Sequence, residues 1–226
     1  MSQISEWFRI GGPLYNWQTL IAGGLAVGAA LVGGLFINCQ IRATERIERD
    51  RRDREFGAAR AALPLTLNAL TLYAQESCEH LRAILLTRVD GAIPPQADPK
   101  LPPEFPLRAV EDLRIMIATA DAPVRDSLSQ LVGHLQVEIA RLTSLMRDLR
   151  ESPNNNRVVT ALNIEDYILD AAETYARCAA LFPLARGSSD EVPGAPSRDA
   201  MEHALRQLGL WSDEFPQVHA RLAQRY

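Results

Sequence analysis

Residues 20–37 read LIAGGLAVGAALVGGLFI, eighteen consecutive positions without a polar side chain. No charged residue lies between Arg9 and Arg42, and counting from Trp17 gives 21 residues to the end of the apolar stretch. As an α-helix, a segment of this length is about 31 Å long, which matches a bilayer hydrocarbon core of about 30 Å. The sequence therefore predicts one transmembrane helix over residues 17–38.

A cleaved signal peptide is the main alternative for this stretch. Signal peptides have a basic leader, an apolar core of about 7–15 residues and a cleavage site flanked by small residues. Here the charges of Glu6 and Arg9 cancel in the leader, the apolar stretch is longer, and arginines follow it directly. This pattern favours a retained membrane anchor.

Arginines are distributed unequally on the two sides of the predicted span. Residues 39–60 contain seven arginines, whereas Arg9 is the one basic residue before the span. Basic residues that flank a span tend to remain in the cytoplasm, and acidic residues contribute little to this bias. We therefore expect residues 1–16 to form a short outer or interfacial segment and residues 61–226 to be cytoplasmic, in a single-pass arrangement.

Small residues recur along the predicted span at a spacing of four, and Gly24 and Gly28 form a GxxxG pair. Such stripes let two helix backbones approach closely, so that packing drives association within lipid. Glycine is also frequent in spanning helices generally. The pattern therefore leaves open whether the helix pairs with a second copy, packs on a partner membrane protein or stays alone. The candidate helix-association residues are Ala22, Gly24, Ala26, Gly28, Ala30 and Gly34.

The segment after the span, residues 39–60, is predicted to be a charged juxtamembrane helix. Acidic residues precede arginines by four positions at Glu45–Arg49 and Glu48–Arg52, a spacing that stabilises a helix by about 0.2–0.5 kcal/mol per pair. Seven arginines and five acidic residues leave a net charge of +2. Basic stretches beside a membrane attract anionic headgroups, but the interleaved acids favour a solvated helix. Membrane lipid is an expected partner.

Beyond residue 60, apolar residues recur every three or four positions, as in amphipathic helices that pack on a core. No stretch alternates with period two between turn signals, so β-structure is not expected. We predict an all-α chain in which residues 61–226 form an antiparallel helical bundle, with a proline-rich loop at 89–106 and a flexible link at 187–197. The most regular segment places Val124, Leu128, Leu131, Leu135, Ile139, Leu142, Leu145 and Leu149 in the core.

Prolines and caps predict details of the bundle. Pro64 is expected to kink the chain or to mark a first helical turn. Asn156 is expected to cap a helix over about residues 157–185, whose buried face includes Val158 and Leu162. The buried face of the first bundle helix is expected to contain Leu63, Leu67, Leu70, Ala74, Leu81 and Leu85.

The composition of the 226 residues, 47% hydrophobic and 23% charged, excludes a disordered chain. The 24 basic and 28 acidic residues give a net charge of −4. This balance disfavours nucleic acid as a partner, because neutralising phosphates requires a basic surface. The three cysteines are widely spaced and odd in number, so we expect Cys78 and Cys178 to be buried thiols and Cys39 to lie at the inner membrane edge.

Two pairs of residues are candidate metal ligands. Glu76 with His80, and His134 with Glu138, each place a carboxylate one helical turn from an imidazole. Antiparallel neighbouring helices would bring the four groups together, but such pairs are also common on surfaces, and the Glu-x-x-His pattern of di-iron bundles is missing. The chain contains no GxxxxGK[ST], GxGxxG, GxSxG or HExxH motif, so neither a catalytic residue nor a cofactor is predicted.

A further acidic cluster lies on one face of the helix expected after Asn156. Asp166, Asp170 and Glu173 share this face, with Arg177 one turn beyond Glu173. Acidic clusters can bind cations or act as acid and base, but exposed faces with salt-linked pairs are far commoner. The pattern therefore predicts an exposed, ion-paired face.

The segment NWQTLIAG at residues 16–23, followed by a Gly/Ala-rich span and an arginine-rich helix, resembles the N-terminal anchor of small uncharacterised bacterial inner-membrane proteins. The resemblance covers about a quarter of the chain. It implies a location in the bacterial inner (plasma) membrane and supplies no activity.

The leading hypothesis is a membrane-anchored, non-catalytic helical interaction or assembly module that works as a homo-oligomer or with a partner membrane protein. Two alternatives stay open. One is a membrane-tethered metal-binding or enzymatic bundle, and the other is a membrane-perturbing effector that oligomerises through the glycine stripe.

Overall fold

The computed structural model of the chain describes residues 11–94, 101–151 and 158–226. These residues form six helices and no strand, apart from two isolated β-bridges. The all-α prediction is therefore confirmed. Residues 1–10 of the predicted outer segment lie outside the described residues.

Helix α1 (Gly11–Leu86) is 76 residues long and carries both the apolar stretch and the first bundle helix. The chain divides into two compact units, Met1–Asp53 and Arg54–Tyr226, and α1 contributes to each of them. Among the described side chains of the first unit, the apolar ones are exposed, and Leu20 and Leu25 each keep 70% of their surface. Among the described helices α1 alone is long and apolar enough to cross a membrane, a test that a signal sequence near an N-terminus also passes.

Helix α1 passes through Pro64 without a break. The expectation that this proline marks a first helical turn is wrong, because the helix already begins at Gly11. A proline in a helix interior removes one backbone hydrogen bond and costs about 3 kcal/mol. Leu63 and Leu67 on either side of it are 2% and 0% exposed, so burial of the leucine face stabilises the helix across this position.

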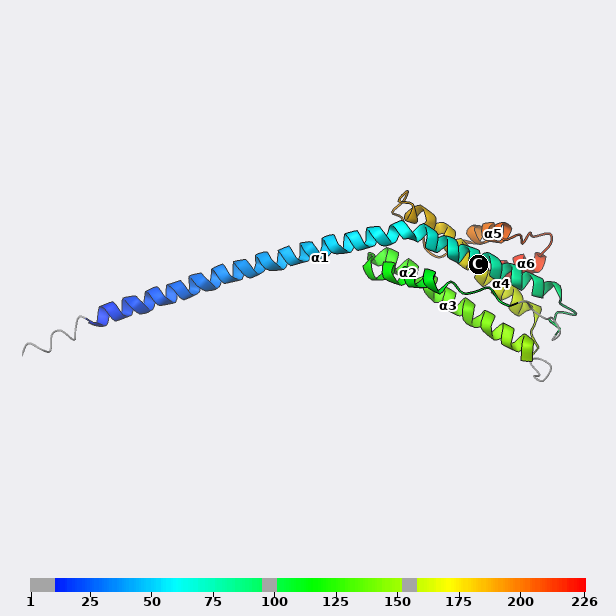
Figure 1. The fold of residues 1–226 in the computed structure, drawn as a ribbon, viewed down its shortest axis with the longest axis horizontal. Coiled ribbons are helices and arrows are strands. Elements are labelled where there is room, and N and C mark those ends of the chain that lie inside the picture. The colour runs from blue at the N-terminus through cyan, green and yellow to red at the C-terminus, as the bar shows by residue number, and fades with distance from the viewer. Residues whose placement is uncertain (1–10, 95–100, 152–157) are drawn as a thin grey trace, which may run out of the picture. The chain divides into compact units, whose positions relative to one another are not determined.

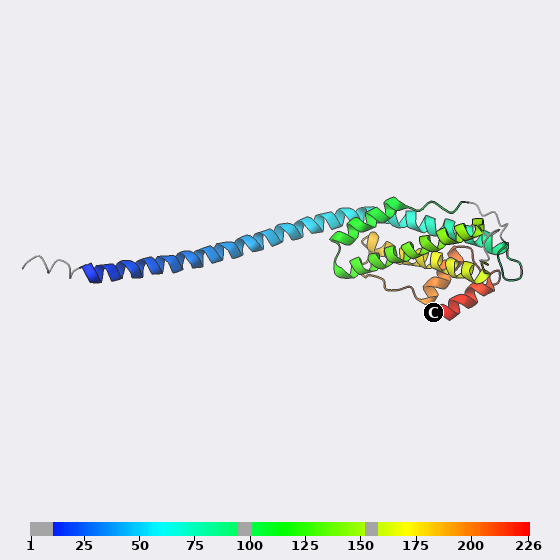
Figure 2. The same ribbon diagram turned by 90° about the horizontal axis from the view of Figure 1, so that it is seen from below.

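Five further helices complete the second unit: α2 (Leu107–Thr119), α3 (Ala122–Glu151), α4 (Ala161–Ala185), α5 (Arg198–Gln207) and α6 (Pro216–Arg225). Helix α4 packs against α3, α5 and α6, and α2 packs against α3 (Figures 1 and 2). The central position of α4 explains why its side chains meet those of several other helices.

The predicted core faces are largely confirmed. On α3, seven of the eight expected positions are buried, and the exception is Ile139, whose neighbour Glu138 is buried instead. On α1, every position predicted for the buried face of the bundle helix is 3% exposed or less: Leu63, Leu67, Leu70, Ala74, Leu81 and Leu85.

The start of α4 differs from the prediction. The helix begins at Ala161, and Thr160 is its N-cap, with a side-chain oxygen that accepts a hydrogen bond from the Asn163 backbone N–H at 3.4 Å. Threonine is a favoured N-cap because its hydroxyl satisfies a backbone donor that has no partner within the helix. The predicted cap, Asn156, lies outside the described residues.

The backbone just before α4 is extended because it pairs with the turn that follows α1. The Ile93 N–H donates to the Val159 carbonyl at 2.9 Å. This pairing prevents residues 158–160 from joining the helix, and it leaves Val158 71% exposed, while Leu162 in the first turn is 57% exposed. The prediction that these two side chains lie in the core is wrong.

Candidate functional site: an arginine-lined pocket beside α4

The residues considered as metal ligands have different partners. Glu76 is exposed, and His80 Nε2 lies 3.2 Å from Met146 Sδ. His134 Nε2 lies 2.9 Å from the Asp170 carbonyl oxygen, so this nitrogen carries a hydrogen, since a carbonyl only accepts. Within the described parts of the chain, no group of three or more His, Cys, Asp or Glu residues is arranged to hold a metal ion.

Glu138, the fourth of these candidates, is a carboxyl group in the core. Its side chain is 2% exposed, and Thr174 Oγ1 on α4 donates a hydrogen bond to Oε2 at 2.5 Å. Burial raises the pKa of Glu138 to about 7, and the Thr174 hydrogen bond opposes this shift. The second oxygen, Oε1, and Ser77 Oγ are both buried with no hydrogen-bond partner among the described residues. Glu138 therefore changes its charge close to neutral pH.

The two cysteines of the bundle are buried, as predicted. Cys78 is 1% exposed and Cys178 is 0% exposed, whereas Cys39 is exposed. Burial raises the pKa of each buried thiol to about 12. Because the thiolate is the nucleophile and metal ligand, these two thiols act as small apolar side chains of the core.

The carboxylates expected on an exposed face of α4 are mostly buried. Asp170 is 2% exposed and Glu173 is 6% exposed, whereas Asp166 is half-buried. The expected ion pair within the helix is present, since Arg177 Nη2 donates to Glu173 Oε1 at 2.7 Å. The prediction of an exposed face is wrong for Asp170 and Glu173, because arginines from two other helices cover them.

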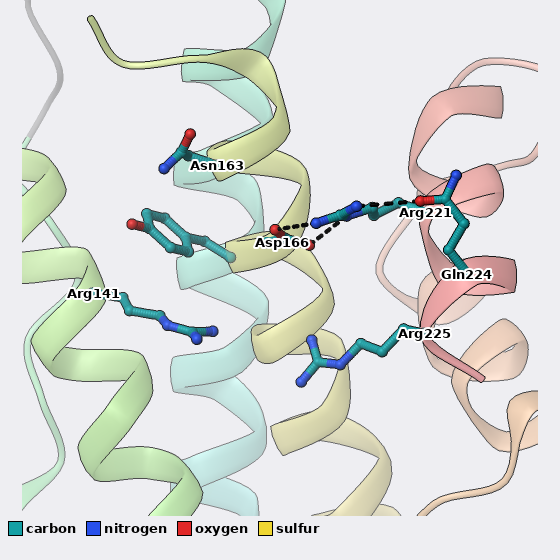
Figure 3. A pocket seen from close by; sticks show the side chains of 7 residues that line it. Arg141, Asn163, Asp166, Arg221, Gln224 and Arg225 are labelled. Carbon is teal, nitrogen blue, oxygen red and sulfur yellow. Dashed lines mark hydrogen bonds and ion pairs between the residues drawn. The ribbon is translucent and has the colours of Figure 1, made fainter. Parts of the chain in front are cut away.

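Asp170 on α4 pairs with arginines from two other helices, α3 and α6. Arg141 on α3 and Arg225 on α6 approach it from the two sides of α4 (Figure 3). Arg141 Nη1 donates to Oδ2 of Asp170, and Arg225 Nη1 donates to Oδ1 at 2.9 Å. Arg225 Nη2 also donates to Glu173 Oε2 at 3.1 Å. The buried carboxylates thus connect α4 to both α3 and α6.

Asp166 has its own arginine. Arg221 Nε and Nη2 donate to its two carboxylate oxygens at 2.7 and 2.8 Å. This hydrogen bonding lowers the pKa of Asp166 by more than burial raises it. Burial acts to raise the pKa of Glu173 as well. His134, Arg177 and Arg225 together lower it by more. Both carboxylates are therefore ionised at neutral pH.

A pocket of about 580 Å³ opens over this cluster (Figure 3). Its size falls within the range of about 300–1,000 Å³ that is common for small-molecule sites. The guanidinium carbon of Arg141 lies 5.9 Å from the centroid of the Tyr167 ring. The pocket is lined by Arg141, Asn163, Asp166, Tyr167, Arg221, Gln224 and Arg225.

The predicted helix-association residues are exposed on the apolar part of α1. A Cβ atom added at Gly24, Gly28 or Gly34 meets nothing within 4 Å, so in the single chain these glycines leave open space. Association through this stripe stays a prediction.

The three arginines of the pocket were not predicted from the sequence, although the spacing of two of them pointed to a shared helix face. Arg221 and Arg225 are one helical turn apart, so they share a face of α6. Arg141 has no second pocket arginine on its own helix, so no spacing in the sequence points to it. Glu138 was detectable as a core residue, since it continues the three-four spacing between Leu135 and Leu142.

The described residues thus define an all-α protein with one candidate membrane-spanning helix and an ion-paired helical bundle. Comparison with known proteins adds no relative, because no family model, no curated protein and no solved structure matches the chain.

Proposed function

We propose that the protein is a single-pass, membrane-anchored helical module that acts by binding or assembling partners and not by catalysis. The exposed apolar stretch of α1 carries this proposal. Leu20, Leu25, Leu31 and Leu35 are each 66–70% exposed. Burying a side chain of this size contributes about 1.5–3 kcal/mol, so such a helix surface is stable when lipid surrounds it.

The arginines that follow the apolar stretch support one orientation. Residues 39–60 carry seven arginines and the preceding segment carries Arg9, so the positive-inside bias directs the bundle to the cytoplasm and the N-terminus to the outside. Together with the resemblance of residues 16–23 to anchors of bacterial inner-membrane proteins, this bias favours the bacterial inner membrane.

The chemistry of the bundle favours binding over catalysis. Asp166, Asp170 and Glu173 hold three helices together through arginines. The pKa values of Asp166 and Glu173 are lowered, so these two carboxylates remain ionised instead of exchanging protons. The thiols of Cys78 and Cys178 are buried and protonated.

The topology is tested with two C-terminal fusions of the full-length chain in bacteria. Alkaline phosphatase is active only after export, and green fluorescent protein is fluorescent when it remains in the cytoplasm. We expect fluorescence without phosphatase activity, and both reporters in the membrane pellet. Recovery of the fusion in the supernatant after high-speed centrifugation without detergent contradicts the anchor.

Assembly is tested by crosslinking in intact membranes, followed by detergent extraction and mass determination. The module hypothesis predicts a discrete species heavier than the monomer, either a second copy or a partner. A product that is monomeric at every crosslinker concentration contradicts it.

A further inference from the structure

The pocket beside α4 brings three guanidinium groups into one wall. Arg141 comes from α3, and Arg221 and Arg225 come from α6. Figure 3 shows Arg141 and Arg225 pointing toward one another across α4. We propose that this pocket binds the phosphate group of a small molecule. The proposal does not depend on membrane anchoring.

Positive charge is in excess at this wall. Among the described residues, Asp166 is the one acidic residue that lines the pocket. Asp170 lies behind the wall, and its single negative charge faces two guanidinium groups. With Glu173 and Arg177 included, four arginines contact three carboxylates. Glu165 also interacts electrostatically with Arg221 and balances the fourth arginine. The excess positive charge that an incoming anion meets is therefore that of the lining itself, three guanidinium groups against Asp166.

The arginines keep hydrogen-bond donors for a ligand. Each guanidinium group has five N–H donors. Arg141 donates one of them to Asp170, and Arg225 donates one to Asp170 and one to Glu173. The side chains of Arg141 and Arg225 are 44% and 34% exposed, so donors that do not face the buried carboxylates are accessible from the pocket.

The carboxylates also hold the arginines in place before any ligand arrives. Arg221 is fixed by two hydrogen bonds to Asp166, and Arg141 is fixed between Asp170 and the ring of Tyr167. Side chains that are already ordered lose little conformational freedom on binding. The cluster is therefore pre-organised for an anion.

A phosphate group suits this wall better than a carboxylate. It offers more acceptor oxygens, so three guanidinium groups can donate to it at once, and the planar guanidinium fork matches phosphate geometry. The volume of about 580 Å³ accommodates a small phosphorylated molecule. A nucleic acid is disfavoured, because residues 61–226 contain 16 basic and 22 acidic residues.

The test uses full-length protein in neutral detergent, titrated with inorganic pyrophosphate at constant ionic strength and followed by calorimetry. We expect saturable binding that Arg141→Gln weakens by about tenfold or more, the size expected when a charge-assisted hydrogen bond is lost. Arg141 is the suitable position because Asp170 keeps Arg225 as a partner. Arg198→Gln is the matched control, since Arg198 pairs with Glu202 on α5 and does not line the pocket.

The control variant should change the affinity by less than about twofold, because solvent screens a distant surface charge. Absence of saturable binding to the wild type, or equal weakening by both variants, overturns the proposal. If circular dichroism shows that Arg141→Gln is unfolded, Arg141→Lys decides. It keeps a positive charge beside Asp170 but removes the guanidinium fork, so it should weaken binding, and unchanged binding overturns the proposal.

A second arm identifies the source of the phosphate. The titration is repeated at the same ionic strength in nanodiscs of phosphatidylcholine, with and without phosphatidylglycerol. Equal pyrophosphate affinities assign the pocket to a soluble phosphate compound. Weaker affinity in the presence of phosphatidylglycerol assigns it to a lipid headgroup that competes for the same arginines. Both outcomes support phosphate as the ligand group.

Discussion

Replacing the buried Glu138 by glutamine should remove a fall in stability of up to about 3 kcal/mol between pH 5 and 8. Glu138 Oε2 accepts a hydrogen bond from Thr174, and Oε1 is buried without a partner. Glutamine keeps an oxygen for Thr174 and places an NH₂ group at the second position. Ser77 lies close enough to lower the pKa of Glu138, and its buried hydroxyl oxygen is an available acceptor for that NH₂ group.

The size of the effect follows from the pKa of Glu138, which burial raises from 4.5 to about 7. Below pH 4.5 the carboxyl group is protonated in both the folded and the unfolded chain, so its contribution to stability is fully present. As the pH rises toward 7, the unfolded chain loses the proton while the folded chain keeps it, and stability falls. At about 1.4 kcal/mol per pH unit, the total loss is about 3 kcal/mol.

The assay is urea unfolding of the full-length protein in detergent, followed by the helical circular dichroism signal from pH 5 to pH 8. Relative to Glu138→Gln, we expect the free energy of unfolding of the wild type to fall by up to about 3 kcal/mol over this range. His80, whose pKa burial lowers, and Glu165, whose pKa burial raises, titrate in both proteins and cancel in this difference. At pH 5 the two proteins should be similarly stable, and at pH 8 the variant should be the more stable one.

A matched control is Glu202→Gln, which removes an exposed carboxylate of α5 that pairs with Arg198. It should keep the pH dependence of the wild type. Asp166 and Glu173, whose pKa values are lowered, lose their contributions only as the pH falls below the ordinary carboxyl range, so they do not obscure the result. Parallel pH profiles for the wild type and Glu138→Gln would refute the reasoning.

Three further predictions concern the bundle and the apolar part of α1. Asp170→Ala removes the shared partner of Arg141 and Arg225, but both guanidinium groups reach solvent and Arg225 keeps Glu173. It should lower the free energy of unfolding by about 1.5–3 kcal/mol in urea titrations. Leu131→Ala removes a side chain that is 0% exposed and should cost about 2–5 kcal/mol, whereas Leu162→Ala, at a position 57% exposed, should cost no more than about 0.5 kcal/mol. Equal losses of unfolding free energy for the two variants contradict the assignment of the core. Gly24→Leu combined with Gly28→Leu should abolish a crosslinked homodimer, because leucines prevent close approach of the backbones; an undiminished dimer places the contact elsewhere.

The local spacing of apolar residues was sufficient to predict which segments of this protein are helices. The apolar stretch at residues 20–37 and the leucine spacing from Val124 to Leu149 are properties of neighbouring residues, since a helix returns to the same face every three or four positions. The all-α class, the core face of α1 and most of the core face of α3 were predictable for this reason. The N-cap of α5 is also local: Ser197 accepts a hydrogen bond from the Ala200 N–H at 3.2 Å, and serine is a favoured N-cap residue.

Packing between helices decided what local pattern left open. The spacing of Asp166, Asp170 and Glu173 shows that they share a face of α4, but the same spacing occurs on wet surfaces and at buried contacts. That Asp170 is buried follows from Arg141 and Arg225, which approach from helices 29 and 55 residues away in the chain. Partners at such separations leave no periodic trace in the sequence, because each depends on how the helices are oriented about α4. The arginine-lined pocket therefore exists only in the tertiary structure.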